Sequence, residues 1–216
     1  MKLQKVTLPT YTKGEEIFNA ISHGLGIPLG ILALIVCLLK ASDVNTIVGS
    51  VVFALSVVVL YTCSTLYHSL KRSDAKKVMR ILDHSTIFIL ITGTSIAMTV
   101  ICVYPYHKVL AIVMSSLSFI LSTVGTALTF IDQEKYKKAQ MTLYMVVGWI
   151  TVVLIYPIYK NCGGTIVALI AVGGIIYTVG VIFYAMGKKK KYFHSIFHLF
   201  VLCGTILHFL CIYNAI

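Results

Sequence analysis

Residues 192–213 read YFHSIFHLFVLCGTILHFLCIY, an apolar stretch long enough to cross a bilayer as one helix. Two histidines, His194 and His198, stand four residues apart near its start. On a helix this spacing places both imidazoles on one face, with Cβ atoms about 5–6 Å apart. Such a pair can bind one metal ion. The stretch therefore predicts a membrane span that carries two candidate metal ligands near one end.

The composition indicates an integral membrane protein. Of the 216 residues, 58% are hydrophobic and only 12% are charged, which is too apolar for a soluble domain. The net charge of +11 is better explained by basic loops beside anionic lipid than by a nucleic-acid partner. The six cysteines form no CxxC pair, so we expect buried thiols and no disulfide framework. The first sixteen residues are polar, and we expect no cleavable signal peptide.

Seven apolar runs of roughly 19–24 residues match the length needed to cross a bilayer. We place them at residues 17–39, 47–70, 81–103, 109–131, 141–159, 165–186 and 193–213. Because the connections between them are short, we expect residues 1–216 to form a single all-α membrane domain, a seven-transmembrane-helix bundle.

Basic residues orient this predicted bundle. The N-terminal segment and the loops after the second, fourth and sixth runs hold fifteen of the 18 Lys and Arg residues. The remaining three, Lys40, Lys108 and Lys160, lie on the opposite side. By the positive-inside rule, this distribution predicts a cytosolic N-terminus and an extracytoplasmic C-terminus in the cell membrane.

With that topology, polar residues from four spans reach the same depth near the cytosolic side. They are Glu16, Asn19 and His23 of the first span, Ser64 and His68 of the second, Asp83 of the third, and His194 and His198 of the seventh. His208 is excluded because it lies about 15 Å further along the seventh span and on another face. His107 is excluded because it lies in an outer loop.

The chemistry of this layer favours a metal site. Three neutral imidazoles, from His68, His194 and His198, leave a fourth position for water, as in catalytic zinc sites, and zinc is favoured by ligand type and cellular availability. A single histidine is more often a packing residue, and Asp83 could simply stabilise a helix N-terminus or pair with Arg80 or His84. A carboxylate at mid-membrane costs about 2.5–3.5 kcal/mol, so we expect Asp83 to have a partner or a task.

Four segments together resemble the bacterial haemolysin III branch of the progestin and adipoQ receptor family. They are EEIFNAISHG, STLYH, LDHSTIFILITGT and HSIFHLFVLCGTILHF, and the resemblance extends over essentially the whole chain. One departure is visible: members of the family often continue the third-helix Gly-Thr with Tyr-Thr-Pro, whereas Gly93 and Thr94 are followed here by Ser-Ile-Ala. The departure touches none of the candidate ligands.

The resemblance implies seven helices around a zinc ion with ligands on His68, His194 and His198. It places the family's aspartate on Asp83, where it holds or activates the zinc water, and the family's serine on Ser64. It also implies second-shell or structural roles for three residues of the first span, which are Glu16, Asn19 and His23.

Two classes of function remain open. The first is an intramembrane zinc amidohydrolase or esterase that acts on a lipid, similar to the related ceramidases, in membrane lipid and fluidity homeostasis. Asp83 would be its general base and Ser64 an orienting or oxyanion group, because the chain has no HExxH motif to supply a base. The second is a lipid sensor or a cytolytic protein with a structural zinc. The spans lack the rows of polar residues that a water-filled pore needs, which disfavours a lytic channel.

The topology can be tested by labelling single cysteines at Lys189 and Lys160 in a variant without the native cysteines. We expect a membrane-impermeant reagent added outside the cell to label position 160 only. Labelling of position 160 solely from the cytosolic side would contradict the orientation.

Overall fold

A computed structural model of the protein describes residues 3–187 and 190–216. Every regular element in these two ranges is helical. In chain order the elements are η1 (Leu3–Lys5), α1 (Lys13–Gly24), α2 (Gly26–Lys40), α3 (Val44–Ser69), α4 (Asp74–Cys102), α5 (Lys108–Asp132), α6 (Lys137–Gly148), η2 (Ile150–Leu154), α7 (Ile155–Cys162), α8 (Gly164–Met186) and α9 (Phe193–Ala215).

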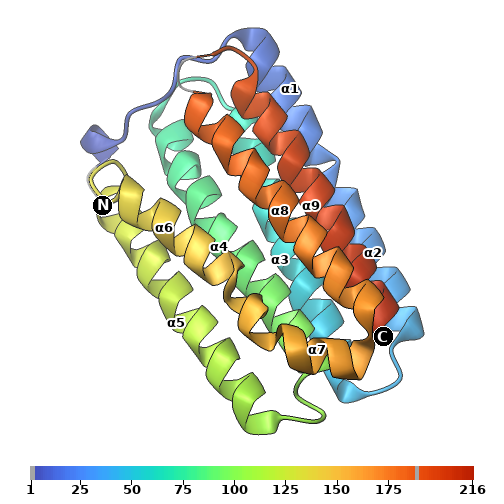
Figure 1. Cartoon of the computed structure of the whole chain (residues 1–216). Helices are drawn as coiled ribbons and strands as arrows, with labels where there is room; N and C mark the ends of the chain where they lie inside the picture. The colour runs from blue at the N-terminus through green and yellow to red at the C-terminus, as the bar shows by residue number, and fades with distance from the viewer. Residues whose placement is uncertain (1–2, 188–189) are drawn as a thin grey trace.

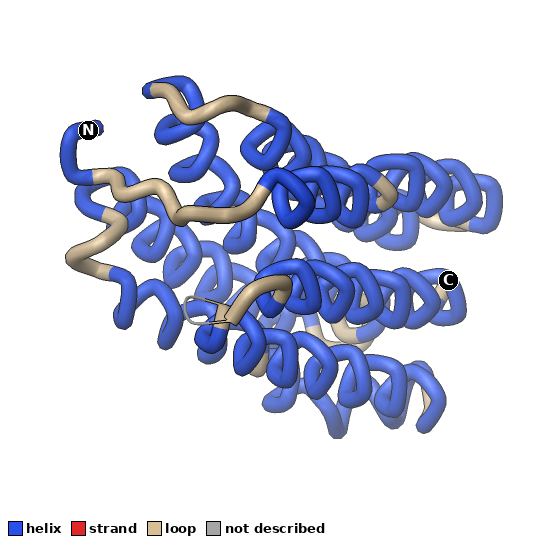
Figure 2. Tube along the Cα trace, turned by 90° about the horizontal axis from the view of Figure 1, so that it is seen from above, coloured by secondary structure: helices blue, strands red, loops and turns tan. Residues whose placement is uncertain are grey.

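These helices form one bundle (Figure 1). Within the described ranges, seven helical segments are long and apolar enough to cross a membrane, and the seven-helix prediction is confirmed. They are Lys13–Lys40, Val44–Ser69, Asp74–Cys102, Lys108–Asp132, Lys137–Cys162, Gly164–Met186 and Phe193–Ala215. Figure 2 shows the helices running side by side, with most loops gathered at the ends of the bundle.

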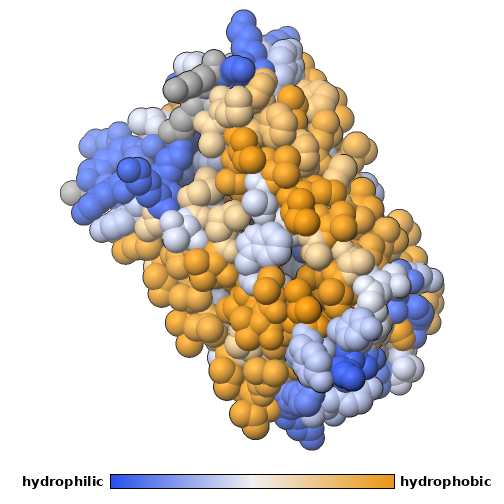
Figure 3. All heavy atoms as spheres, viewed as in Figure 1, coloured by the Kyte–Doolittle hydropathy of each residue, from blue (hydrophilic) through white to orange (hydrophobic). Residues whose placement is uncertain are grey.

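The surface of the bundle suits lipid. Figure 3 shows hydrophobic side chains over the middle of one face and hydrophilic side chains towards its two ends. Large apolar side chains are left exposed on several helices, for example Leu39 at 83%, Val109 at 77% and Val153 at 65%. A soluble monomer rarely exposes so much contiguous apolar surface, whereas a bilayer covers it without cost.

The first span is two helices joined at Leu25. Thr12 begins α1 with a capping box, in which Glu15 accepts a hydrogen bond from the backbone N–H of Thr12 and its own N–H donates to the Thr12 hydroxyl. Pro28 has no N–H to donate one turn back, which weakens the helix at the junction. Gly26 lies against the ring of Tyr61 on α3, so α2 and α3 pack closely there.

The third span begins earlier than the apolar run that marks it. We predicted a start at residue 81, but α4 begins at Asp74, where the Ser73 hydroxyl accepts a hydrogen bond from the N–H of Lys76. The first two turns are amphipathic and contain Lys76 and Arg80, so hydropathy does not reveal them. Asp83 therefore lies in the third turn of α4 and not in the first.

The fifth span is interrupted. We predicted one apolar run over 141–159, whereas the structure has α6, the short 3₁₀ segment η2 and α7. Trp149 stands at the break and donates its indole N–H to the hydroxyl of Thr178 on α8 at 3.1 Å. Pro157 lies in α7 and cannot donate to the carbonyl one turn back, within η2.

One end of the bundle carries most of the basic side chains, and we name it the basic end. There α3 ends and α4 begins, α5 ends and α6 begins, and α8 ends and α9 begins (Figure 1). Lys2, Lys188 and Lys189 of the predicted basic set lie outside the described residues. Which side of the membrane this end faces stays a prediction.

The close approach of α2 and α3 predicts the effect of Gly26→Ala. A Cβ at this position would lie 2.2 Å from the ring of Tyr61, which is fully buried. We expect overpacking to destabilise the protein by about 1–3 kcal/mol, measured as a lower midpoint of thermal unfolding in detergent.

Gly148→Ala is the matched control, because a Cβ there meets nothing within 4 Å. The control should be neutral or slightly stabilising, since alanine favours a helix. Equal midpoints for Gly26→Ala and the wild type would show that the helices can separate at this contact.

Candidate metal centre

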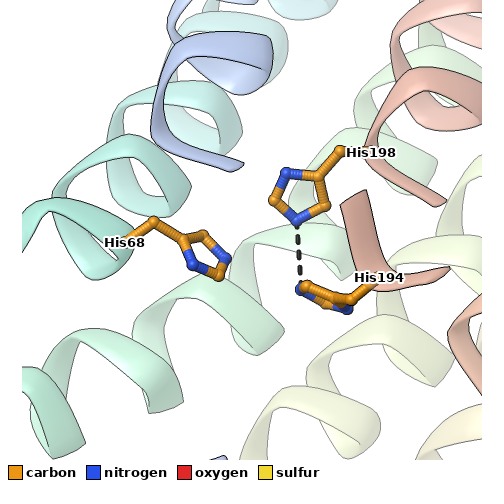
Figure 4. Close-up of side chains that lie close together, drawn as sticks. All are labelled: His68, His194 and His198. Atoms are coloured by element: carbon orange, nitrogen blue, oxygen red, sulfur yellow. Dashed lines mark hydrogen bonds between the residues drawn. The ribbon is translucent and has the colours of Figure 1, made fainter. Parts of the chain in front are cut away.

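Three histidines converge near the basic end from two helices. His68 comes from the last turn of α3, and His194 and His198 come from the first two turns of α9 (Figure 4). One ring nitrogen of each lies within 4.8 Å of the other two, and the three side chains are buried or nearly so. Among the described residues this is the group whose geometry could hold a metal ion. Sequence spacing predicted all three.

The partners of His68 leave one nitrogen free for a ligand. Its Nδ1 lies 2.7 Å from Oε2 of Glu16, and a carboxylate can only accept, so Nδ1 carries the proton. Its Nε2 is buried and has no hydrogen-bond partner among the described residues. Seven other buried side-chain atoms of the described residues also lack a partner, but this nitrogen belongs to the group of three histidines that could hold an ion, and a bound ion would satisfy it.

His198 and His194 give the same indication. The Nδ1 of His198 donates to the backbone carbonyl of Asn19 at 3.3 Å, which leaves its Nε2 unprotonated. That Nε2 lies 3.1 Å from the Nε2 of His194, the contact drawn in Figure 4. The Nε2 of His198 can only accept here, so the contact needs the proton of His194 or a cation between the two nitrogens. Three imidazoles, two of which have their N–H groups bonded outward, fit a zinc ion.

Glu16 connects this group to α4. Its second carboxylate oxygen accepts a hydrogen bond from Nζ of Lys76 at 2.7 Å, and the same ammonium donates to the carbonyl of Leu70 at 2.9 Å. Lys76 is almost completely buried. Glu16 therefore has a charged partner on one oxygen and His68 on the other, the orienting arrangement expected behind a metal ligand.

Asn19 connects α1 to α9. Its side-chain oxygen accepts a hydrogen bond from the hydroxyl of Ser195 at 2.6 Å, and its carbonyl accepts hydrogen bonds from Ser22 and His198. Asn19 therefore contacts His198 and Ser195, and its predicted role behind the metal ligands stays a prediction.

Ser64, His23 and Asp83 form a second group beside the histidines. The Nδ1 of His23 lies 2.7 Å from the hydroxyl of Ser64, and the His23 ring stacks on the ring of His198 at 3.5 Å between centroids. The Ser64 hydroxyl also interacts with the Asp83 carboxylate. Arg80, the alternative partner weighed for Asp83, instead donates to Glu134 at 2.8 Å.

Asp83 and His194 lie between two cavities. A cavity of about 140 Å³ extends into the bundle, and most of its walls are apolar. A pocket of about 340 Å³ opens at the basic end and is more polar. Both are lined by Asp83, His84, Tyr184 and His194. A molecule with a polar head and an apolar tail could therefore contact this site from both sides.

The two excluded histidines lie away from the group. His208 lines the inner cavity, and its Nε2 donates to the carbonyl of Ile170 at 3.4 Å. His107 immediately precedes α5, at the end of the bundle opposite to the basic end.

Sequence reasoning missed Tyr11. Its ring stacks on His194 at 5.1 Å between centroids and lies 5.9 Å from the ring of His68. Burial raises the pKa of its hydroxyl well above the ordinary range, so the side chain stays neutral. Tyr11 lies outside the apolar runs and one residue before the cap of α1, so neither hydropathy nor a ligand motif could identify it.

The segment before α1 is held across the basic end by contacts along its length. Thr7 donates to Glu134 at 2.8 Å, Lys5 pairs with Asp132 at 3.0 Å, and the guanidinium of Arg72 donates to the carbonyl of Pro9 at 3.0 Å. These contacts place Tyr11 over the histidines, where it covers the site from the end of the bundle.

Comparison with known proteins agrees with this geometry. A family described as "Haemolysin-III related" matches residues 11–209. The chain is 36% identical to Hemolysin-3 of Bacillus cereus over 97% of this chain and 95% of that protein. It is 34% identical to the Hemolysin-3 homolog of Bacillus subtilis (strain 168) over 94% of each. It is also 29% identical to the human Monocyte to macrophage differentiation factor, over 44% of this chain and 39% of that protein.

The family match covers both helices that carry the three histidines, as well as α1 and α4. With seven membrane-spanning helices and these relatives, the protein is a multi-pass cell membrane protein. The chain belongs to the haemolysin-III-related family.

Proposed function

We propose that the protein is a zinc-dependent hydrolase that cleaves an amide or ester bond of a membrane lipid. The observation that supports this best is the position of Asp83 and His194, which line both a polar pocket and an apolar cavity and belong to the same cluster as the other two histidines. A lipid has the same division, because its cleavable bonds lie between a polar head and apolar chains. By the family resemblance, such an activity would serve membrane lipid and fluidity homeostasis.

The donor set supports zinc. His68, His194 and His198 supply three buried imidazole nitrogens, and the partners of His68 and His198 orient their unprotonated atoms towards the group. When bound, zinc supplies a Lewis acid that polarises a carbonyl and lowers the pKa of water towards ~7. Three protein ligands leave the fourth coordination position of zinc open for water or substrate. A purely structural zinc site does not need this open position.

Asp83 is the proposed general base. Its carboxylate lines both cavities together with His194, so it can take a proton from water that attacks at their junction. In this proposal the Ser64 hydroxyl donates a hydrogen bond to Asp83 and accepts one from Nδ1–H of His23, which lies 2.7 Å away. This chain favours Ser64 as a group that orients Asp83 over Ser64 as an oxyanion donor.

The inner cavity supports a lipid substrate. Leu90, Met98, Phe197 and Val201 contribute to its walls, and their apolar side chains suit a hydrocarbon chain. The polar pocket, with a volume of about 340 Å³, has room for a headgroup, and Arg80 and Glu134 supply charged groups in its lining.

A sensor with a structural zinc is the second candidate. The histidines connect the end of α3 to the start of α9, so a metal there would fix two helices that are far apart in sequence. A cytolytic role is suggested only by the names of the two Bacillus relatives.

Metal content tests the proposed centre. We expect about one zinc per purified chain. The variants His68→Ala and His194→Ala should lose most of this zinc. They should also unfold at a lower temperature, because zinc binds only the folded site. Mass spectrometry of the metal is the measurement. His208→Ala is the control and should keep its zinc, since His208 bonds to Ile170 away from the centre. Unchanged zinc in His194→Ala would disprove the ligand assignment.

Asp83→Asn separates the enzyme from the sensor. Asparagine keeps the size of the side chain but cannot accept the proton, so we expect the variant to retain zinc and fold while lipid hydrolysis falls about 10²–10⁴-fold. Lipid analysis of membranes from cells that express each variant is the measurement. If Asp83→Asn keeps the full cellular effect while His68→Ala loses it, the zinc is structural and the protein is a sensor.

A further inference from the structure

A groove on the outer surface of the bundle lies beside the metal centre. It has a volume of about 610 Å³ and runs between the first turns of α1 and the segment that joins α3 to α4. We name it the interface groove, after its position at the basic end, where apolar spans give way to charged loops. Glu16 and His68 line it, so it borders the centre from a side different from the two cavities.

Cations predominate around the groove. Lys13, Lys71, Arg72 and Lys76 line it, against one carboxylate, Glu16. Lys76 is neutralised by its ion pair with Glu16. Among the described residues, the ammonium groups of Lys13 and Lys71 have no ion-pair or hydrogen-bond partner, and both residues are exposed.

Arg72 adds a third positive charge. Its guanidinium donates to the carbonyls of Pro9 and Leu8, and these neutral groups leave its charge uncompensated. Three positive charges, on Lys13, Lys71 and Arg72, therefore surround an opening at the membrane surface. An anion bound there would reduce their mutual repulsion.

The wall of the groove that continues towards the bilayer is apolar. Ile17, Ala20 and Ile21 line it, and their spacing of three and four residues places them on one face of α1. Ile17 is 50% exposed and Ile21 is 61% exposed, so this face is open to lipid. The ligand that fits is an anion with an attached hydrocarbon chain.

We infer that the interface groove binds an anionic phospholipid, with its phosphate among Lys13, Lys71 and Arg72 and one acyl chain along Ile17 and Ile21. The site is distinct from the proposed substrate cavities and does not depend on hydrolysis. It holds a lipid against the outer side of Glu16 and His68, the two residues that border both the groove and the centre.

Native mass spectrometry of the detergent-solubilised protein tests this inference. The protein is titrated with 1-palmitoyl-2-oleoyl phosphatidylglycerol or with the matching phosphatidylcholine, and the first bound lipid is counted. The wild type should prefer the anionic lipid. The double variant Lys13→Gln, Lys71→Gln should lose that preference by about 25-fold, since each basic residue near an anionic headgroup contributes about fivefold.

The matched control is Lys135→Gln, Lys138→Gln. These lysines are also exposed at the basic end but do not line the groove, and the variant has the same net charge as the test variant. The control should keep the preference for the anionic lipid. An equal loss in both variants would show general attraction to a basic surface and would overturn the inference, as would an unchanged preference in the test variant.

A third arm separates a lipid from a soluble anion. Glycerol 3-phosphate at millimolar concentration should not displace the bound lipid, because it lacks the chain that contacts Ile17 and Ile21. Displacement would show a site for a soluble phosphate and would overturn the lipid assignment. All of these measurements detect lipid binding and require no substrate turnover. They can therefore be interpreted even if the protein proves to have no hydrolase activity.

Discussion

The carboxylate of Glu16 is the interaction on which the arrangement of the centre depends. One oxygen bonds to His68 on α3 and the other to Lys76 on α4, so a single side chain of α1 sets the positions of two neighbouring helices. The adjacent Glu15 points elsewhere, as successive residues on a helix differ by about 100°. It caps α1 and accepts a hydrogen bond from the backbone N–H of Tyr192 at 2.8 Å, immediately before α9. The two acids together connect α1 to α3, α4 and α9.

Lipid makes such connections obligatory. A polar group that faces hydrocarbon without a partner costs several kcal/mol, so polar side chains in a span must satisfy one another. In this bundle they do so in one layer, through Asn19 and Ser195 between α1 and α9 and through His23 and Ser64 between α1 and α3. Several buried atoms of this layer are still left without a partner among the described residues, including Nδ2 of Asn19, Nε2 of His23 and Nε2 of His68, and the last belongs to the three histidines that could hold an ion.

The sequence predicted the helices that hydropathy can reveal and the residues that helical spacing can group. The i, i+4 spacing of His194 and His198 identified two of the three candidate ligands, because spacing within one helix is a local property. The break at Trp149 and the early start of α4 escaped prediction, since both depend on capping and on contacts with other helices. Tyr11 was not predicted as part of the site, because its position is set by contacts between the N-terminal segment and residues far away in the chain.

The position of Tyr11 has a practical consequence for handling the protein. The N-terminal segment crosses the basic end and covers the histidines, whereas α9 ends on the opposite side of the bundle (Figure 1). An affinity tag fused before Leu3 adds its mass within reach of the metal centre, and a polyhistidine tag there also brings competing imidazoles to it. A tag that follows Ile216 stands the length of a span away, and zinc counted on such a preparation reports on the native ligands.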